Sequence, residues 1–325
     1  MPLLQVKNLC TYFKKDAGAL SKLFGRGTKI VRAVDGVSFN IEEREIFGLV
    51  GESGCGKTTV GNSVLRLVEP TSGKIFFEGE DLLNMGDKEL HKFRLKAQLI
   101  SQNARSSLNP RMNVGEILSE PFEIHKLTNY EDEIEEKVRN LLKIVGLSPY
   151  DVNKYPHEFS GGEARRITVA RALALHPKLV VADEPTSGLD VSIMAQVINL
   201  MVEMQDKFGL TYLWISHNLH IVRHIADRLA VMYLGKIVEM GSGEEIFQNP
   251  LHPYTQALFS SVPDVMSKKK EKIILEGEVP SPINPPLGCR FGPRCWRVNS
   301  LCKNKEPKLV EIENCHWVAC HRCET

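Results

Sequence analysis

The pattern of hydrophobic and polar positions predicts strands and helices that alternate along the chain. Residues 37–41 alternate as a half-buried strand should, and residues 46–50 form an apolar run that leads into a glycine-rich loop. Later apolar runs predict strands at 178–183 and 211–216, with a helix at 191–208 between them. Strands that alternate with helices predict a largely parallel sheet that is covered on both faces.

Helical periodicity dominates the stretch 86–160, which we expect to form an inserted helical subdomain. Within it, residues 131–147 place five apolar side chains on one helical face: Ile134, Val138, Leu141, Leu142 and Val145. The opening apolar positions predict a first strand, and the basic, glycine-containing segment 14–30 predicts a loop. The helix after the glycine-rich loop is expected to reach about Glu69, and the proline-rich chain after Gly241 is expected to hold little regular structure.

Composition narrows the class of protein. The 325 residues are enough for a large core, and 41 Lys and Arg against 40 Asp and Glu give a nearly neutral chain. A dedicated nucleic-acid binder is usually markedly basic, so we expect no nucleic-acid partner. No apolar stretch approaches the roughly 18 residues that span a bilayer, and the N-terminus lacks the pattern of a secretory signal. We therefore expect a cytosolic protein that needs partner subunits if it acts at a membrane.

Residues 51–58 fit the phosphate-binding pattern G-x-x-x-x-G-K-[ST]. Backbone N–H groups of such a loop surround phosphates at the start of a helix, where the partial positive charge favours anions. Lys57 is expected to neutralise the β- and γ-phosphates, and Thr58 to supply a hydroxyl to Mg²⁺. The residues that we expect to contact ATP here are Gly51, Ser53, Gly54, Cys55 (at a variable position), Gly56, Lys57, Thr58 and Thr59.

Two carboxylates follow the apolar run 179–182. Asp183 ends the strand, where it can hold Mg²⁺ through water, and Glu184 is then placed to orient or deprotonate an attacking water. An acidic pair can also end a strand simply for solvation. The upstream glycine loop and the residues 187–190 that follow favour the catalytic interpretation.

Residues 159–163, Phe-Ser-Gly-Gly-Glu, resemble the signature motif of ABC-type ATPases, usually Leu-Ser-Gly-Gly-Gln. The resemblance implies an α/β fold: a P-loop ABC-type ATPase with a mixed sheet core, an inserted helical subdomain and a Cys-rich C-terminal extension. In that family two ATPase subunits pack head to tail, and the signature of one closes over the γ-phosphate bound by the other. The trans-acting residues implied are Ser160, Gly161, Gly162, Glu163 and, in the D-loop, Asp190.

Other residues match further motifs of the family. Gln102 resembles the Q-loop glutamine, which contacts Mg²⁺ and water, and His217 resembles the switch histidine, which contacts the γ-phosphate. Phe13 matches the aromatic residue that stacks on adenine, with Tyr12 as the alternative. The resemblance implies the catalytic residues Glu184, His217, Lys57 and Gln102. It implies that Mg²⁺ is held by Thr58, Gln102 and Asp183.

Glu163 departs from the family pattern, in which glutamine is usual at this position. A carboxylate beside a triphosphate is unfavourable unless a nearby arginine offsets its charge. Arg165 and Arg166 follow closely in the sequence. The departure bears on hydrolysis in the opposite site of a dimer, whereas the chain's own half-site follows the family pattern.

C-terminal segments resemble those of ATPases from oligopeptide and dipeptide importers. They are residues 249–258, 288–295, Cys302 and 318–321. The basic segment 14–30 and residues 107–112 resemble the F-type subunit of such importers. The resemblance implies a nucleotide-binding domain at 1–250 and a C-terminal extension at 251–325.

Six of the eight cysteines lie in the last 37 residues. In a reducing compartment such clustering favours metal or cluster ligation over disulfides. The resemblance implies a [4Fe–4S] cluster, which takes four thiolates, on Cys289, Cys295, Cys302 and Cys320. Zinc, free thiols and disulfides formed in air are the alternatives, and Cys315 and Cys323 are surplus to the family pattern.

The resemblance thus implies an ATP-hydrolysing subunit that powers di- or oligopeptide import from the cytoplasmic side of the cell membrane, as a peripheral protein. Its implied partners are two transmembrane permease subunits, a second ABC ATPase subunit in a homo- or heterodimer, and indirectly an external solute-binding protein. Nickel complexes and certain sugars travel through related systems, so the solute stays open. The alternatives are a soluble ABC ATPase acting on ribosomes or DNA, and a regulatory or redox-sensing ATPase subunit.

Overall fold

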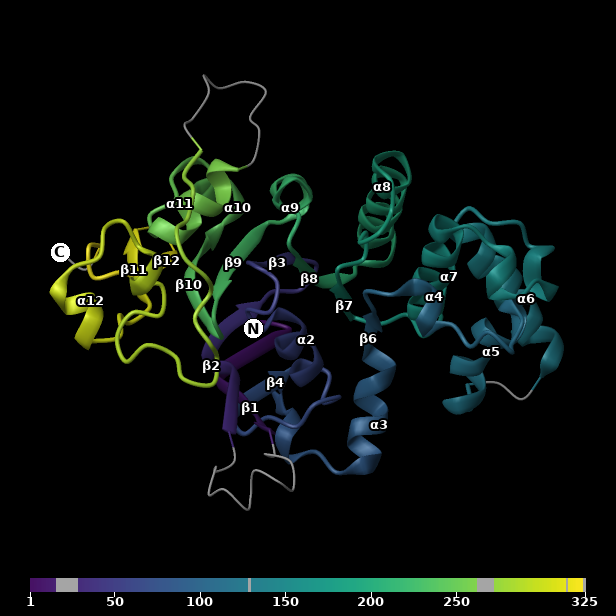
Figure 1. Cartoon of the computed structure of the whole chain (residues 1–325). Helices are drawn as coiled ribbons and strands as arrows, with labels where there is room; N and C mark the ends of the chain where they lie inside the picture. Colours follow the sequence, from purple (N-terminus) through teal and green to yellow (C-terminus); the bar gives the residue numbers. More distant parts are fainter. Residues whose placement is uncertain (16–28, 128–129, 262–271, 314, 324–325) are drawn as a thin grey trace, which may run out of the picture. The chain divides into compact units, whose positions relative to one another are not determined.

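A computed structural model describes residues 1–15, 29–127, 130–261, 272–313 and 315–323. The chain divides into two compact units (Figure 1). Unit 1 comprises Met1–Asn84 and Ile215–Thr325, and unit 2 comprises Met85–Trp214. Strands and helices alternate along the chain, and both parallel and antiparallel strand pairs occur, as expected for an α/β fold with a mixed sheet.

An antiparallel sheet of four strands opens unit 1. Its strand β1 (Leu4–Lys15) lies between β2 (Lys29–Ile41) and β4 (Ser72–Phe77), and β5 (Glu80–Asp81) pairs with β4. The two long strands pair as far as Lys15 and Lys29. The prediction of a loop at 14–30 is therefore wrong at both of its ends, because the backbone hydrogen bonds of the hairpin continue further than the hydrophobic pattern. Residues 16–28 lie outside the described part of the chain.

A second set of strands in unit 1 carries the glycine-rich loop. The strand β3 (Ile46–Val50) is fully buried, and it pairs in parallel with β9 (Arg228–Tyr233). After β3 the loop leads into α2 (Lys57–Val64). This helix ends earlier than the predicted Glu69, because Arg66 adopts a left-handed φ of 50° that no α-helix continues.

The C-terminal part of the chain holds more regular structure than its prolines predict. Antiparallel pairing extends β9 to β10 (Lys236–Ser242), then to β12 (His316–Val318) and β11 (Val310–Glu313). Four helices accompany these strands: α9 (Leu219–Ile225), α10 (Gly243–Gln248), α11 (Pro253–Ser260) and α12 (Ser300–Asn304). The last strands, drawn in yellow in Figure 1, thus belong to the same set of strands as β3.

Unit 2 contains the predicted helical stretch and three strands. In sheet order the strands are β8 (Thr211–Ser216, which ends just beyond the unit), β7 (Leu179–Asp183) and β6 (Ala97–Ile100). The helices are α3 (Asp87–Lys96), α4 (Ala104–Ser107), α5 (Val114–Ile124), α6 (Glu131–Ile144), α7 (Gly161–Leu173) and α8 (Val191–Phe208). The predicted apolar face of α6 is confirmed, since Val138, Leu141 and Leu142 are buried.

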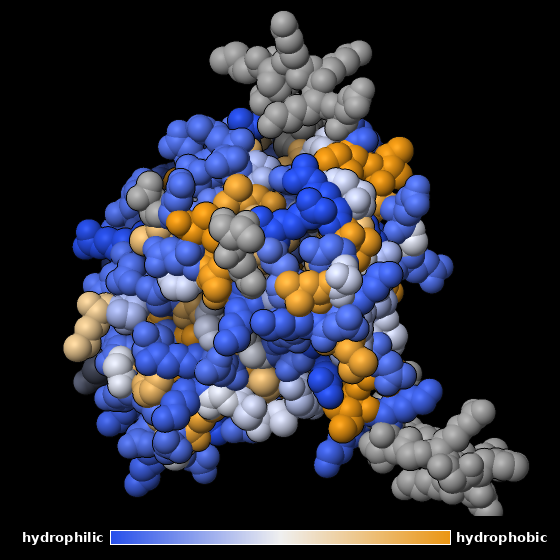
Figure 2. All heavy atoms as spheres, turned by 90° about the vertical axis from the view of Figure 1, so that its left-hand side faces the viewer, coloured by the Kyte–Doolittle hydropathy of each residue, from blue (hydrophilic) through white to orange (hydrophobic). Residues whose placement is uncertain are grey.

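The surface carries scattered hydrophobic side chains. Figure 2 shows the side of the molecule on which the C-terminal strands lie, where hydrophobic groups form small patches among hydrophilic ones. The exposed apolar residues of the C-terminal part include Ile274, Leu287 and Trp296. Within the ranges that the structure describes, no helix has the length and apolar character needed to cross a membrane.

A buried carboxylate ties the C-terminal segment to β10. The side chain of Glu239 is fully buried and accepts hydrogen bonds from the backbone N–H groups of Leu251, at 2.7 Å, and His252, at 3.0 Å. Its Oε1 also lies 2.7 Å from Nε2 of His316 on β12. One side chain therefore links β10, the start of α11 and β12.

We expect the Glu239→Ala substitution to lower the free energy of unfolding by about 3 kcal/mol, because it leaves three buried polar groups without their acceptor. Chemical denaturation of the full chain measures the change. The matched control is Glu313→Ala, which removes an exposed carboxylate on β11 and should change stability by less than about 0.5 kcal/mol. Equal stabilities of the two variants would contradict this role of Glu239.

Candidate functional site

The glycine-rich loop between β3 and α2 is closed around the amine of Lys57. This side chain is only 5% exposed, and its Nζ donates to the carbonyl oxygens of Gly51, at 2.8 Å, and Glu52, at 3.0 Å. Gly56 has a φ of 109°, and a Cβ there would lie 2.2 Å from the carbonyl oxygen of Ala33. No other residue fits that position. The loop leads directly into the start of α2, and a helix start of this kind favours an anion.

The two candidate adenine-stacking residues have different surroundings on β1. The hydroxyl of Tyr12 donates to Oδ1 of Asp35 at 2.5 Å, and the guanidinium of Arg32 lies 5.8 Å from the centre of its ring. Phe13, by contrast, is 41% exposed. The exposure favours Phe13, the first choice of the sequence analysis. His217 lies in unit 1 directly after β8 and is exposed.

Unit 2 brings the predicted glutamine and the predicted acids together. Nε2 of Gln102 donates to Oε2 of Glu184 at 3.0 Å. Asp183 is only 6% exposed at the end of β7, and Glu184 adopts a left-handed φ of 47°, which is unusual for a residue other than glycine. Amide and carboxylate oxygens are ligands that Mg²⁺ prefers, so this group has the right chemistry for its predicted role.

A buried arginine, Arg165, holds the backbone on both sides of the peptide bond between Ser101 and Gln102. Arg165 on α7 is 1% exposed, and its two Nη atoms donate to the carbonyl oxygens of Ser101 and Gln102. Burial lowers the pKa of its guanidinium to about 10. Its partners are backbone carbonyls, so no sequence motif marks the contact. Arg165 thereby joins the signature helix to the segment that carries Gln102.

The signature residues form the first turn of α7. The backbone N–H and the hydroxyl of Ser160 both donate to Oε2 of Glu163, at 2.9 and 2.7 Å, and the N–H of Glu163 donates to the Ser160 hydroxyl at 3.3 Å. This is a capping box. The hydrogen bonds from the Ser160 backbone and side chain lower the pKa of Glu163, so its carboxylate is ionised at neutral pH.

The arginines after the signature bond elsewhere. Arg166 donates to the carbonyl oxygens of Val145 and Gly146 and to Oε1 of Gln196, and Arg165 donates to the carbonyls of Ser101 and Gln102. None of these bonds goes to Glu163, so they do not support the idea that one of the two arginines offsets its charge. At the start of α8, the side chain of Asp190 accepts from the N–H of Ile193 at 3.0 Å and caps that helix.

The four cysteines of the predicted cluster line one small pocket in unit 1, together with His252 and His321. The N–H of Cys289 donates to the carbonyl oxygen of Cys302 at 2.8 Å. Cys320 interacts instead with Cys323, whose hydrogen bond lowers the pKa of the Cys320 thiol to about 6. In the described ranges no three His, Cys, Asp or Glu side chains are arranged as a metal-binding group, so the cluster stays a prediction.

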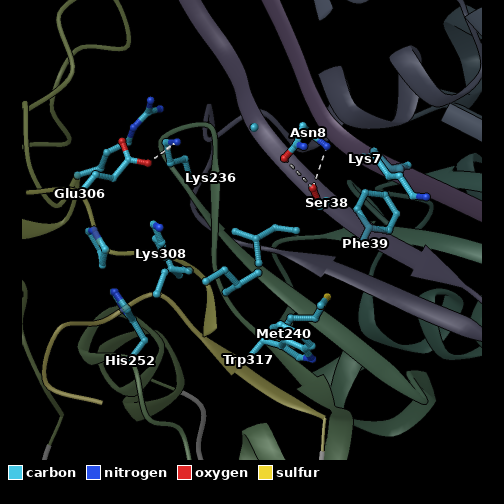
Figure 3. Close-up of a pocket in the computed structure, with 18 of the residues that line it drawn as sticks. Lys7, Asn8, Ser38, Phe39, Lys236, Met240, His252, Glu306, Lys308 and Trp317 are labelled. Carbon is cyan, nitrogen blue, oxygen red and sulfur yellow. Dashed lines mark hydrogen bonds and ion pairs between the residues drawn. The ribbon is translucent and has the colours of Figure 1, made fainter. Parts of the chain in front are cut away.

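A larger cavity of about 720 Å³ lies in unit 1 between β1, β2, β10 and the C-terminal segment (Figure 3). Its wall combines aromatic and apolar groups with lysines: Phe39, Met240, Trp317, Lys7 and Lys308. Lys236 and Glu306 form an ion pair of 2.5 Å at its edge. No sequence motif marks this cavity, because its wall comes from segments far apart in the chain. Of the predicted site residues, Cys289 lines it.

Comparisons with known proteins agree with the motifs. The sequence profile described as "ABC transporter" matches residues 34–187, and the profile described as "Oligopeptide/dipeptide transporter, C-terminal region" matches residues 238–302. The oligopeptide transport ATP-binding protein AppF of Bacillus subtilis is 50% identical over 98% of this chain and 97% of its own length. The dipeptide transport ATP-binding protein DppF of Haemophilus influenzae is 44% identical over 98% of this chain and 96% of its own.

Solved structures show the same fold. The ATP-binding cassette MJ0796, determined as a post-hydrolysis dimer with ADP and phosphate, has a TM-score of 0.64 and 25% identity over 74% of this chain and 98% of its own. The protein cbiO1 of Clostridium perfringens, part of the ABC transporter complex cbiONQ, has a TM-score of 0.63 and 28% identity over 76% of this chain and 91% of its own.

The capping box leads to a prediction about Glu163. Replacement by glutamine keeps an acceptor for Ser160 but removes a negative charge where the signature is expected to meet a triphosphate. We expect Glu163→Gln to lower the KM for ATP about threefold, because it removes the repulsion of one negative charge that solvent and salt partly screen. Steady-state ATPase assays measure the change.

The matched control for Glu163 is Glu158→Gln. Glu158 makes a similar bond, from the N–H of Tyr155 at 2.7 Å, and precedes the signature. Its replacement should leave the KM unchanged. A KM that is unaltered in Glu163→Gln, or lowered equally in both variants, would contradict an electrostatic role of Glu163.

Proposed function

Since the chain belongs to the family of ABC transporter ATP-binding proteins, in its oligopeptide and dipeptide branch, we propose that it binds and hydrolyses ATP to power peptide import. The observation that carries the proposal is the phosphate-binding loop closed around Lys57 in a chain whose C-terminal region matches that of peptide transporters. The same C-terminal match argues against a soluble ATPase of ribosomes or DNA and against a purely regulatory subunit.

The reaction that we propose is in-line attack of water on the γ-phosphate of ATP, which breaks the bond between the γ-phosphorus and the bridging oxygen and releases ADP and inorganic phosphate. Phosphate binding would draw the Lys57 amine from the loop carbonyls towards the β- and γ-oxygens, where its charge stabilises the transferring group. Glu184 orients the water and accepts its proton, and Gln102 holds the carboxylate of Glu184 in place. His217 is proposed to contact the γ-phosphate and Phe13 to stack on adenine.

Mg²⁺ is the expected partner of the nucleotide, and it would neutralise charge on the β- and γ-phosphates. Thr58, Gln102 and Asp183 are the residues that we propose to hold it. Their hydroxyl, amide and carboxylate oxygens suit this ion. The burial of Asp183 at the end of β7 supports the assignment, because a buried carboxylate is stabilised by a cation.

A second ATPase subunit would complete the site. We propose that Ser160, Gly161, Gly162, Glu163 and Asp190 act on the nucleotide of the partner subunit. The signature stands at the start of the 13-residue helix α7, where backbone N–H groups favour an anion. The dimer reported for the cassette MJ0796 with ADP and phosphate supports the arrangement. The pair is proposed to bind two transmembrane permease subunits at the cytoplasmic face of the membrane. An external solute-binding protein would deliver the solute to these permease subunits.

We expect the Glu184→Gln substitution to lower kcat for ATP hydrolysis at least about 100-fold, the usual minimum for loss of a general base. ATP binding should be retained, because the side-chain amide keeps the size of the carboxylate. ATPase assays and calorimetric titration with MgATP measure the two quantities. Glu203→Gln, on the exposed face of α8, is the control and should keep full turnover. Undiminished turnover in Glu184→Gln would remove this residue from the proposed role.

We also propose that the C-terminal cysteines hold a [4Fe–4S] cluster through Cys289, Cys295, Cys302 and Cys320. The common pocket of the four side chains supports the proposal, since four thiolates are what such a cluster takes. A structural role for the cluster fits best, because the reaction proposed for this chain, ATP hydrolysis, transfers no electrons. Zinc on the same thiolates is the alternative.

The cluster proposal predicts broad visible absorption and bound iron in anaerobically purified chain. Cys302→Ser should lose both, because it removes one of four thiolate ligands. Cys315→Ser is the matched control, since Cys315 is exposed and does not line the pocket, and it should keep both. Iron and zinc analysis distinguishes the outcomes. Zinc without iron would favour the zinc alternative. If the protein contains no iron and no zinc, a metal centre at these cysteines is excluded.

A further inference from the structure

The C-terminal segment contacts the phosphate-binding loop directly, through an ion pair between residues that are 242 positions apart in the sequence. Nη1 of Arg294 lies 2.9 Å from Oε2 of Glu52, and Nη2 lies 3.3 Å from Oε1. Two parallel bonds of this kind hold a guanidinium and a carboxylate in one geometry. The Arg294 side chain is 9% exposed and that of Glu52 is 29% exposed, so the pair is better shielded from solvent than an ordinary surface ion pair.

The backbone of Glu52 is held by the same part of the chain. Its N–H donates to the hydroxyl of Tyr254 on α11 at 2.9 Å. The Tyr254 ring is fully buried and packs against Tyr233, at 4.7 Å between ring centres, and Phe291, at 5.4 Å. Arg294 lies over Tyr233, 5.9 Å from its ring centre. Both the side chain and the backbone of one loop residue are therefore fixed by the C-terminal segment.

The position of Glu52 makes these contacts relevant to phosphate binding. Its carbonyl and that of Gly51 accept the hydrogen bonds of the Lys57 amine. Its carboxylate adds a negative charge to a loop that is built to bind a polyanion. Repulsion between like charges weakens binding unless a cation is close, and Arg294 is the cation that forms an ion pair with Glu52.

Arg294 is itself placed by the cysteine-rich turn. It ends the short turn Gly292–Arg294, and its N–H donates to the carbonyl oxygen of Phe291 at 2.9 Å. The turn lies between Cys289 and Cys295, whose backbones bond to it: the N–H of Gly292 donates to the Cys289 carbonyl at 2.9 Å, and the N–H of Cys295 donates to the Gly292 carbonyl at 3.3 Å. The conformation of the cysteine pocket thus sets the position of the guanidinium.

We propose that Arg294 is a positioning residue for nucleotide binding: it offsets the charge of Glu52 and holds the phosphate-binding loop in its binding conformation. The C-terminal segment then contributes to nucleotide binding, because it supplies the residue that positions the phosphate-binding loop. The inference rests on the proposed ATP-binding function and adds a residue from outside the motifs that carry it.

Titration of the full chain with MgATP, in the Glu184→Gln background that prevents turnover, tests the proposal. Arg294→Gln removes the charge but keeps a polar, unbranched side chain, and we expect it to raise the Kd about tenfold. Arg294→Lys, which keeps the charge and loses the paired geometry, should lie between Arg294→Gln and the parent. Lys303→Ala, an exposed cation on α12, is the matched control and should leave the Kd unchanged.

The double variant Glu52→Gln with Arg294→Gln separates charge compensation from a purely structural role. If Arg294 offsets Glu52, removal of both charges should return the Kd to within about threefold of the parent. The deficit of Arg294→Gln alone should also shrink at high salt. A structural role predicts instead that the double variant binds as weakly as Arg294→Gln, or more weakly, at every salt concentration.

Denaturation curves test whether each variant is folded. If Arg294→Gln is not folded, the double variant Glu52→Gln with Arg294→Lys is compared with Arg294→Lys instead. A Kd that is unchanged in Arg294→Gln, or a double variant without recovery, overturns the inference. A parent chain that does not bind MgATP overturns the proposed function instead, so the two failures are distinguishable.

Discussion

Unit 1 depends on one constraint: the loop before α2 must keep a closed backbone in which Gly51, Gly54 and Gly56 have positive φ angles. Strands from two sheets enforce that shape. A Cβ at Gly56 would meet the carbonyl oxygen of Ala33 on β2, and a Cβ at Gly51 would meet the carbonyl oxygen of Met232 on β9. The ammonium group of Lys57 occupies the inside of the loop. The loop is therefore a product of how both sheets of this unit pack, and not of its glycines alone.

The C-terminal segment is built into the same unit. Its strand β12 extends the strands that begin with β3, and Glu239 links β10 to both α11 and β12 by buried hydrogen bonds. Arg294 and Tyr254 then reach back to the loop at Glu52. These contacts, together with the pairing of β12 with β10 and β11, hold a segment rich in prolines in one conformation.

Unit 2 organises its chemistry differently. There side chains position the predicted catalytic groups, by bonds to another side chain and to the backbone. The amide of Gln102 holds the carboxylate of Glu184, and the guanidinium of Arg165 holds the backbone of Gln102 from the signature helix. A change at Arg165 on α7 can thus reach Glu184, the acid directly after β7, through two contacts. In the loop of unit 1, by contrast, backbone carbonyls and N–H groups do most of the positioning.

The sequence by itself determined the features that depend on neighbours in the chain. The loop at 51–58, the signature from Ser160 to Glu163 and the acids Asp183 and Glu184 are each contiguous, so each can be found from a few neighbouring residues, whereas the capping box within the signature became visible only in the structure. Only the tertiary structure decided the ion pair of Glu52 and Arg294, which joins residues 242 positions apart, and the burial of Arg165 against backbone carbonyls. Carbonyl groups are present at every residue and carry no sequence signal, and a pairing at such separation exists only after the sheets have brought its ends together.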